Sequence, residues 1–113
     1  MPEPHHVAVE LDQIVEAARA AGDQWREFLR AGMFSAGVYR LSAGETDHQT
    51  PHAEDEIYYV LSGRGSLRVE DRDLALGPGE IAFVPARAGH RFHDIAEDLT
   101  LLVFFAPAEG SRD

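Results

Sequence analysis

The chain has 113 residues, of which 44% are hydrophobic and 27% charged, and its formal net charge at pH 7 is −10. This length and composition predict one globular domain with its own apolar core. The acidic balance argues against binding to nucleic acid or to an anionic membrane surface, because both attract lysine and arginine. There are no cysteines, no apolar stretch long enough to span a membrane and no signal-peptide pattern at the N-terminus, so we expect a cytoplasmic protein without disulfides.

The first part of the chain, residues 7–31, predicts a short strand followed by helical structure. Apolar residues alternate over residues 7–11, which is typical of a strand. Asp12 is a suitable N-cap for a helix that would end at Gly22. A second helical turn is expected over residues 23–31. Its large apolar side chains would share one edge at helical spacing: Trp25, Phe28 and Leu29.

The residue pattern changes over residues 33–107, where short strand-like runs are separated by turn residues. Typical runs are "EIYYVLS", "EIAFV" and "LTLLVFF", and typical breaks are "SAGETD", "GRG" and "GPGE". Many short strands between glycine and proline turns predict an all-β barrel or sandwich. The whole chain is therefore expected to be one domain, with a flexible tail at residues 108–113.

One stretch concentrates histidines and carboxylates directly before a strand. It reads "DHQTPHAEDEIYYVLSG", residues 47–63. It resembles the first motif of the cupin family, because Gly44, His52, Glu56 and Gly63 stand in register with that motif. Three residues separate His52 from Glu56, and six separate Glu56 from Gly63.

A second stretch, "GEIAFVPARAGHRFHD" at residues 79–94, is similar to the second cupin motif through Gly79, Pro85 and His90. The resemblance spans roughly residues 33–107 and implies a double-stranded β-helix, or jelly-roll barrel, with a short helical N-terminal segment. The sequence departs from the family pattern at three positions. A motif histidine is replaced by Thr50, a motif glycine by Arg87 and a motif asparagine by Asp94.

The resemblance also implies a metal site made of His52, Glu56 and His90. Two imidazoles and one carboxylate leave coordination positions open for water and substrate. We therefore expect one divalent transition metal per chain, and Fe, Mn, Ni and Zn all suit such a set.

A fourth ligand is an open question, because the family's usual histidine is absent at Thr50. His48 would share a strand face with His52, and a bulge at Pro51 would bring it to the metal. The same bulge would equally turn Gln49 inward. In the third alternative, water completes the metal shell and Thr50 lies beside it. Of the three we favour His48, so the expected metal ligands are His48, His52, Glu56 and His90.

The barrel interior is expected to hold a small-molecule ligand. Three large side chains are predicted to line its site: Tyr58, Phe83 and Phe92. The remaining acids of this region are expected to form a solvated rim: Glu45, Asp47, Glu54 and Asp55. The run "IYYVL", residues 57–61, is apolar on both faces, and its outward face predicts a homodimer.

Two classes of function fit these features. The first is a metal-dependent enzyme of dioxygenase, isomerase or lyase type that acts on a small oxygenated metabolite such as a sugar or keto acid. The second is a non-catalytic module that binds or senses a small molecule in the same pocket. Because cupins host many reactions, the resemblance alone does not choose between these classes. We favour the enzyme, because open metal positions are hard to explain in a purely structural site.

Overall fold

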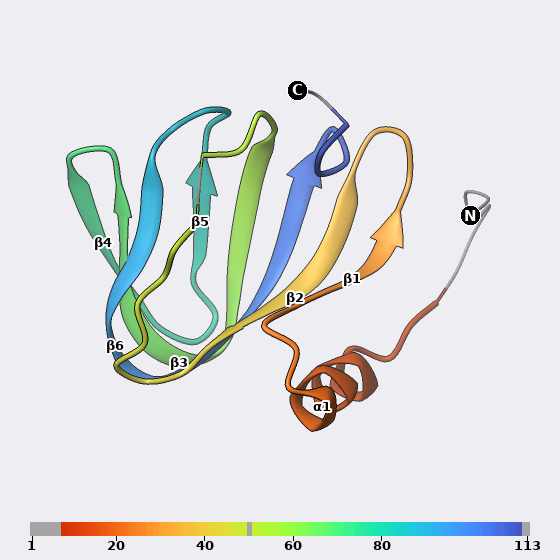
Figure 1. The fold of residues 1–113 in the computed structure, drawn as a ribbon, viewed down its shortest axis with the longest axis horizontal. Helices are drawn as coiled ribbons and strands as arrows, with labels where there is room; N and C mark the ends of the chain where they lie inside the picture. The colour runs from red at the N-terminus through yellow and green to blue at the C-terminus, as the bar shows by residue number, and fades with distance from the viewer. Residues whose placement is uncertain (1–7, 50, 112–113) are drawn as a thin grey trace.

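The computed structural model describes residues 8–49 and 51–111, and Figure 1 shows how their elements are arranged. Within these residues one helix precedes six antiparallel strands, which confirms the prediction of an all-β fold with a short helical N-terminal segment. The elements are α1 (Leu11–Ala21), β1 (Trp25–Arg30), β2 (Ser35–Leu41), β3 (Asp55–Val69), β4 (Arg72–Leu76), β5 (Ile81–Val84) and β6 (His90–Ala106).

Two long strands, β3 and β6, run through both layers of the barrel and pair with each other along most of their length. Their pairing register shifts three times between Val60 and Ser66, and there the strands bend from one layer into the other. The first half of β3 pairs with β5, and the matching half of β6 pairs with β2, which in turn pairs with β1. The second half of β3 pairs with β4, so a smaller layer of β6, β3 and β4 faces the larger one.

The apolar core fills the space between the two layers. Where the strands are regular, alternate residues point inward, as the strand geometry requires, and the largest of them are almost fully buried. Aliphatic side chains dominate toward the bend, and aromatic side chains lie closer to His90. The largest buried apolar side chains are Tyr58, Phe92, Leu41, Leu67, Leu99 and Leu101.

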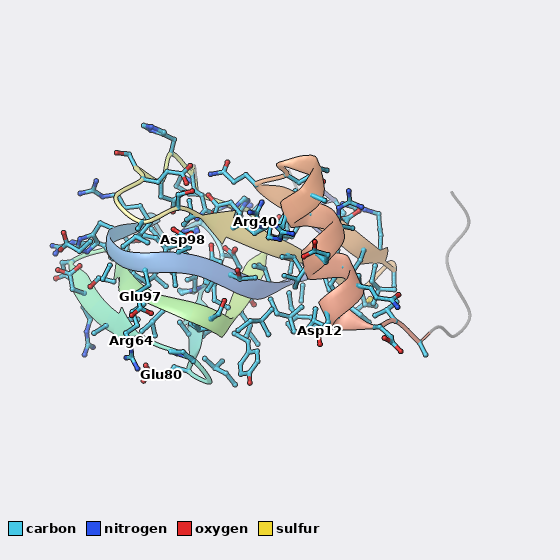
Figure 2. All side chains as sticks on the ribbon, turned by 90° about the horizontal axis from the view of Figure 1, so that it is seen from below. Asp12, Arg40, Arg64, Glu80, Glu97 and Asp98 are labelled. Atoms are coloured by element: carbon cyan, nitrogen blue, oxygen red, sulfur yellow. The ribbon has the colours of Figure 1, made fainter. Side chains whose placement is uncertain are left out.

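Helix α1 lies outside the barrel against β1 and β2 (Figure 1). Its Ala18 is fully buried. Arg40 of β2, labelled in Figure 2, donates from Nη1 to the Asp23 carbonyl oxygen at 2.8 Å. The helix ends at Gly22, which adopts the left-handed conformation as predicted, with φ 72°. Glu10 rather than Asp12 occupies the N-cap position.

Two local predictions for this segment are wrong. Residues 8–10 have no regular structure and Leu11 begins the helix, so no strand forms there; Val7 lies outside the described residues. Residues 25–30 form strand β1 instead of a helical turn. A register shift between Glu27 and Leu29 breaks the alternation of β1, and this irregularity imitates helical spacing in the sequence.

The residues expected to begin a flexible tail pack against the barrel. Ala108 is buried, the Glu109 amide donates to the Ser35 hydroxyl at 2.9 Å, and Arg30 donates to the Glu109 carbonyl oxygen at 2.7 Å. Residues 108–111 therefore close over the ends of β1 and β2. Within the described part of the chain, no helix has the length and apolar character needed to cross a membrane.

Candidate metal centre

Three candidate ligands from distant parts of the sequence meet inside the barrel. His52 comes from the loop before β3, Glu56 is the second residue of β3, and His90 begins β6. One ligand atom from each side chain lies within 4.8 Å of the others. Glu56 and His90 are buried, with 2% and 7% of their surface exposed, and His52 is half-buried. The structure thus brings together the three residues of the predicted metal site.

Two polar atoms of this cluster face each other without a hydrogen bond. The Nδ1 atom of His90 is 3.0 Å from the Ala88 carbonyl oxygen, which accepts its proton and leaves a lone pair on Nε2 in the neutral ring. That Nε2 atom is 3.2 Å from Oε1 of Glu56. Among the described residues, neither atom has a hydrogen-bond partner. Two buried acceptors at this distance repel each other unless a proton or a cation lies between them.

The electrostatics of His90 also favour a positive charge at this point. Burial alone would lower the pKa of His90, but the neighbouring Glu56 carboxylate and the Ala88 carbonyl outweigh it, so the pKa is raised. A cation shared by the imidazole and the carboxylate satisfies both atoms. The donor set of nitrogen and carboxylate oxygen suits a divalent transition metal.

His52 is the third member of the cluster. Its ring packs edge-on against Phe105, with ring centroids 4.9 Å apart, and lies 5.7 Å from the His90 ring. The Nδ1 atom of His52 is 4.0 Å from Oε2 of Glu109. The His52 backbone carbonyl accepts a hydrogen bond from the Arg87 amide at 2.6 Å, which ties the loop before β3 to the loop before β6.

The departure at Arg87 has a visible backbone consequence. Arg87 has a φ of 66°, in the left-handed region that glycine adopts most easily, and it occupies the position of a motif glycine. Its amide is the one that holds the His52 carbonyl. The chain therefore keeps the glycine-like backbone at this position although the residue is an arginine.

Tyr58 and Phe92 lie inside the barrel beside the cluster, where they were predicted to line the ligand site. Both are 1% exposed, and their rings meet edge to face at 4.9 Å. The Tyr58 hydroxyl donates to Oε1 of Gln49 at 3.1 Å, and its ring centroid is 6.2 Å from that of His90. Burial, followed by the negative charge of Glu56, raises the pKa of Tyr58 well above its usual value. Tyr58 is therefore a neutral hydrogen-bonding group at neutral pH.

Asp47 is a structural residue that the sequence interpretation placed wrongly in a solvated rim. It is only 4% exposed, and its carboxylate accepts hydrogen bonds from the Tyr39 hydroxyl at 2.7 Å, the Gln49 amide at 2.8 Å and the Phe92 backbone N–H at 2.8 Å. These donors stabilise the buried charge. Asp47 thereby holds Gln49 with its carbonyl oxygen toward Tyr58.

Of the other acids assigned to the rim, Glu54 is also buried, at 3% exposed, which contradicts the prediction. Glu45 and Asp55 are exposed as expected. Both cap backbone amides: Glu45 accepts from Ser42 at 2.6 Å and Asp55 from Ala86 at 2.8 Å.

Two predicted site residues lie elsewhere. Phe83 is 56% exposed and points outward from β5, because the inward positions of that strand are Ala82 and Val84. His48 is exposed and is not part of the three-residue cluster among the described residues. Thr50 lies outside the described residues. Sequence reasoning missed Glu109, whose position near His52 depends on tertiary packing of the C-terminal segment.

The fold and the cluster together define a class: small jelly-roll barrels with a histidine- and carboxylate-lined interior at one end. The chain belongs to the cupin family, since the family model described as "Cupin domain" matches residues 37–105. This confirms the resemblance inferred from the two motifs.

Relatives of similar length have no described activity in their names. An uncharacterised protein of Streptomyces coelicolor is 47% identical over 104 residues, which cover 91% of this chain and 98% of the relative. An uncharacterised protein of Aquifex aeolicus is 35% identical over 74 residues, covering 65% of this chain and 60% of that protein.

Solved structures with the same fold include the TT1209 protein of Thermus thermophilus, with a TM-score of 0.70 and 27% identity over 89% of this chain and 97% of that one. KdgF from Halomonas sp. has a TM-score of 0.67 at 20% identity, covering 74% of this chain and 76% of that chain. The DMSP lyase DddQ from Ruegeria pomeroyi has a TM-score of 0.66 at 22% identity over 75% of this chain. The matched part of this chain covers 48% of the DddQ chain, so the likeness is to about half of that enzyme.

Proposed function

We propose that this protein is a metal-dependent cupin enzyme that binds one divalent transition metal per chain through His52, Glu56 and His90. The observation that carries the proposal is the buried, unpaired contact between Oε1 of Glu56 and Nε2 of His90 at 3.2 Å. Leaving such groups without partners costs roughly 1–3 kcal/mol each. A bound cation removes that cost and adds two metal–ligand bonds.

The three residues form the whole protein ligand set in this proposal. Gln49 already accepts a hydrogen bond from Tyr58 and donates one to Asp47, and the His48 side chain is exposed. The other coordination positions are left to water and to the oxygen atoms of a substrate. We therefore expect His48→Ala to leave metal affinity unchanged, whereas His52→Ala reduces it.

The substrate in this proposal is a small oxygenated metabolite. A bound divalent metal supplies a Lewis acid for isomerisation, elimination or hydrolysis, and as Fe(II) it activates dioxygen. The protein contributes a fixed environment: Tyr58 offers a hydroxyl whose orientation Gln49 sets, and Phe92 excludes water from the same side. Because a DMSP lyase shares the fold, elimination is the first reaction to test.

A homodimer is part of the proposal. Apolar side chains on the outer face of the larger layer form a continuous patch, because Ile57 of β3 is paired with Phe83 of β5 on one side and with Phe104 of β6 on the other. Their exposures are 41%, 56% and 37%, and Ile81 adds a fourth side chain at 66%. Strand β5, "IAFV", forms the edge of this layer and carries no charge to keep another strand away. A second copy related by a two-fold axis covers this patch with an identical one.

Elemental analysis of the purified protein, followed by a substrate panel with and without added metal, tests the proposed function. We expect about one equivalent of a divalent transition metal and metal-dependent turnover of at least one sugar, keto acid or related compound. Protein that takes up none of Fe, Mn, Ni and Zn contradicts the metal site. Metal-dependent binding without turnover across the panel favours the non-catalytic binding or sensing module instead. A cytoplasmic location stays a prediction from the sequence.

A further inference from the structure

The C-terminal segment that follows β6 reaches back to the metal centre. It is anchored by its backbone: the Glu109 amide donates to the Ser35 hydroxyl, and the Glu109 carbonyl accepts from Arg30. The preceding Ala108 is 3% exposed and packs as part of the buried interior. Because these anchors leave the Glu109 side chain unused, its carboxylate is available for another role.

That carboxylate points at His52. Its Oε2 atom is 4.0 Å from Nδ1 of His52, and both side chains are partly buried, at 30% and 21% exposed. Burial, which is the largest influence, raises the pKa of Glu109, whereas the nearby His52 lowers it. The two groups are thus electrostatically coupled in a part of the barrel that solvent reaches only partially.

Both imidazoles of the cluster have an oxygen atom on the Nδ1 side, at the hydrogen-bonding distance of 3.0 Å in His90 and at 4.0 Å in His52, where the attraction is electrostatic. In His90, Nδ1 faces the Ala88 carbonyl oxygen and Nε2 faces Glu56. In His52, Nδ1 faces the Glu109 carboxylate. A proton held on Nδ1 by an oxygen acceptor leaves Nε2 with its lone pair, which is the form of imidazole that binds a metal.

We propose that Glu109 is a positioning residue that holds His52 in the Nδ1-protonated tautomer and in the ring orientation needed for metal binding. Glu109 acts through His52 and is not itself a metal ligand. This inference rests on the proposed metal site and extends it, since it assigns a task to a segment that follows the last strand. In this proposal the C-terminal segment contributes to the metal centre by orienting His52.

Two readouts test the role of Glu109. Zn²⁺ affinity is measured by competition with a chromophoric chelator, and the ring nitrogens of His52 are observed by ¹H–¹⁵N NMR in the metal-free protein. We expect Glu109→Ala to weaken Zn²⁺ binding about 10–100-fold, as loss of a partner behind a ligating histidine does. The NMR signals should move from the Nδ1-protonated tautomer toward a mixture. Glu109→Gln should recover part of both effects, because its amide keeps an acceptor oxygen on the Nδ1 side of His52.

Glu27→Gln is the matched control. Glu27 carries a negative charge near Glu109, but its carboxylate pairs with Arg30 and not with His52. The variant should stay within about threefold of wild type, because a partly exposed charge at a distance is screened by salt. An equal loss in Glu27→Gln and Glu109→Ala would mean that net charge alone matters, and it would overturn the inference.

The outcomes separate this inference from the proposed function. If Glu109→Ala has the same Zn²⁺ affinity and the same His52 tautomer as wild type, the role of Glu109 is wrong and the metal site still stands. Wild-type protein that binds no metal overturns the proposed function. In that case the NMR measurement on metal-free protein still decides whether Glu109 sets the tautomer of His52.

Discussion

The two halves of strand β3 differ in which kinds of side chain they point into the barrel and toward solvent. In the first half, Glu56 and Tyr58 point inward to the candidate metal centre, and Ile57 lies 41% exposed on the outer face. In the second half, Leu67 points inward to the apolar core beside its cross-strand partner Phe92, and Arg68 lies on the outer face. One half thus has a polar interior and an apolar exterior, and the other half has the reverse.

This inversion identifies the part of the barrel that carries function. A soluble barrel is most stable with apolar residues inside and polar residues outside, as in the second half. The first half departs from that rule on both faces. The inner departure is the basis of the proposed metal site, and the outer departure is the basis of the proposed homodimer.

The bend between the halves depends on a close approach of the β3 backbone at Gly63 to the β6 backbone at Asp98. Gly63 has a φ of 91°, and a Cβ atom there would collide with the backbone carbonyl oxygen of Asp98 in β6. We expect Gly63→Ala to have the largest effect of the changes considered, a loss of about 3 kcal/mol or more in the free energy of unfolding. Denaturant unfolding measures it.

Gly44→Ala is the control for this prediction. Gly44 has a similar φ of 76°, but a Cβ atom there would meet open space. Its cost should be about 1 kcal/mol, which reflects the left-handed backbone alone. Equal losses in the two variants would show that the close approach of β3 and β6 does not set the bend.

Glu56→Gln tests the polar interior of the first half of β3. The amide keeps one acceptor oxygen and adds an N–H₂ group that can donate to Nε2 of His90, so the metal-free protein should be as stable as wild type or more stable by about 1 kcal/mol. Metal affinity should nevertheless fall about 100-fold, because a ligating carboxylate is lost. Thermal melting and metal titration follow the two effects separately.

A parallel loss of stability and affinity in Glu56→Gln would contradict this interpretation, since it would make Glu56 a structural residue. Glu97→Gln is the comparison variant. Glu97 is an exposed acid on the outer side of β6, and its loss should leave both quantities unchanged.

Phe83→Glu tests whether the apolar exterior next to the first half of β3 forms the proposed dimer contact. A charge placed within the proposed dimer contact must lose its hydration or face the same charge on the second copy, so dimer affinity should fall at least about tenfold. Light scattering over a concentration series measures the change. Ala75→Glu, which adds the same charge to an exposed position in β4 of the other layer, should leave the dimer intact. Monomeric wild-type protein at micromolar concentration would contradict the dimer itself.

Much of this arrangement could be predicted from the sequence because strand geometry is local. The spacing of His52, Glu56 and His90 within two motifs placed them in one barrel, and the structure brings them together. The alternation around Tyr58 also indicated which side chains face inward.

The errors arose where tertiary contacts decide the outcome. Strand β1 was taken for a helical turn because a register shift displaced its apolar residues. Asp47 was assigned to solvent, although three donors from separate elements stabilise its burial. Phe83 was assigned to the wrong face of a strand of four residues, where a one-residue error inverts every side chain. Glu109 was missed because only the folded chain brings its carboxylate near His52.

The charged exterior of the second half gives the smallest predicted effect. Asp73 of β4 accepts from Nε2 of His93 at 2.8 Å and from Nη1 of Arg68 at 3.0 Å. The His93 hydrogen bond, more than Arg68, lowers the pKa of Asp73 below its usual value of 3.8. A carboxyl with a lowered pKa in the folded state stabilises the protein above the unfolded-state pKa, and it loses this contribution as pH falls through the folded-state pKa.

Asp73→Asn should therefore melt slightly below wild type at about pH 5–6, and the two melting curves should converge as the pH falls through the folded-state pKa of Asp73, below which the carboxyl is protonated in both states of the wild type. The difference is small because the group is exposed and its charge is screened by water and salt. Asp71→Asn removes the same charge from an exposed position in the adjoining turn, so its melting curve should match that of wild type over the same pH range. A large gap that persists at low pH in Asp73→Asn would mean that Asp73 has a structural role unrelated to its charge. The outer face of the second half would then be more than a set of weak charged pairs.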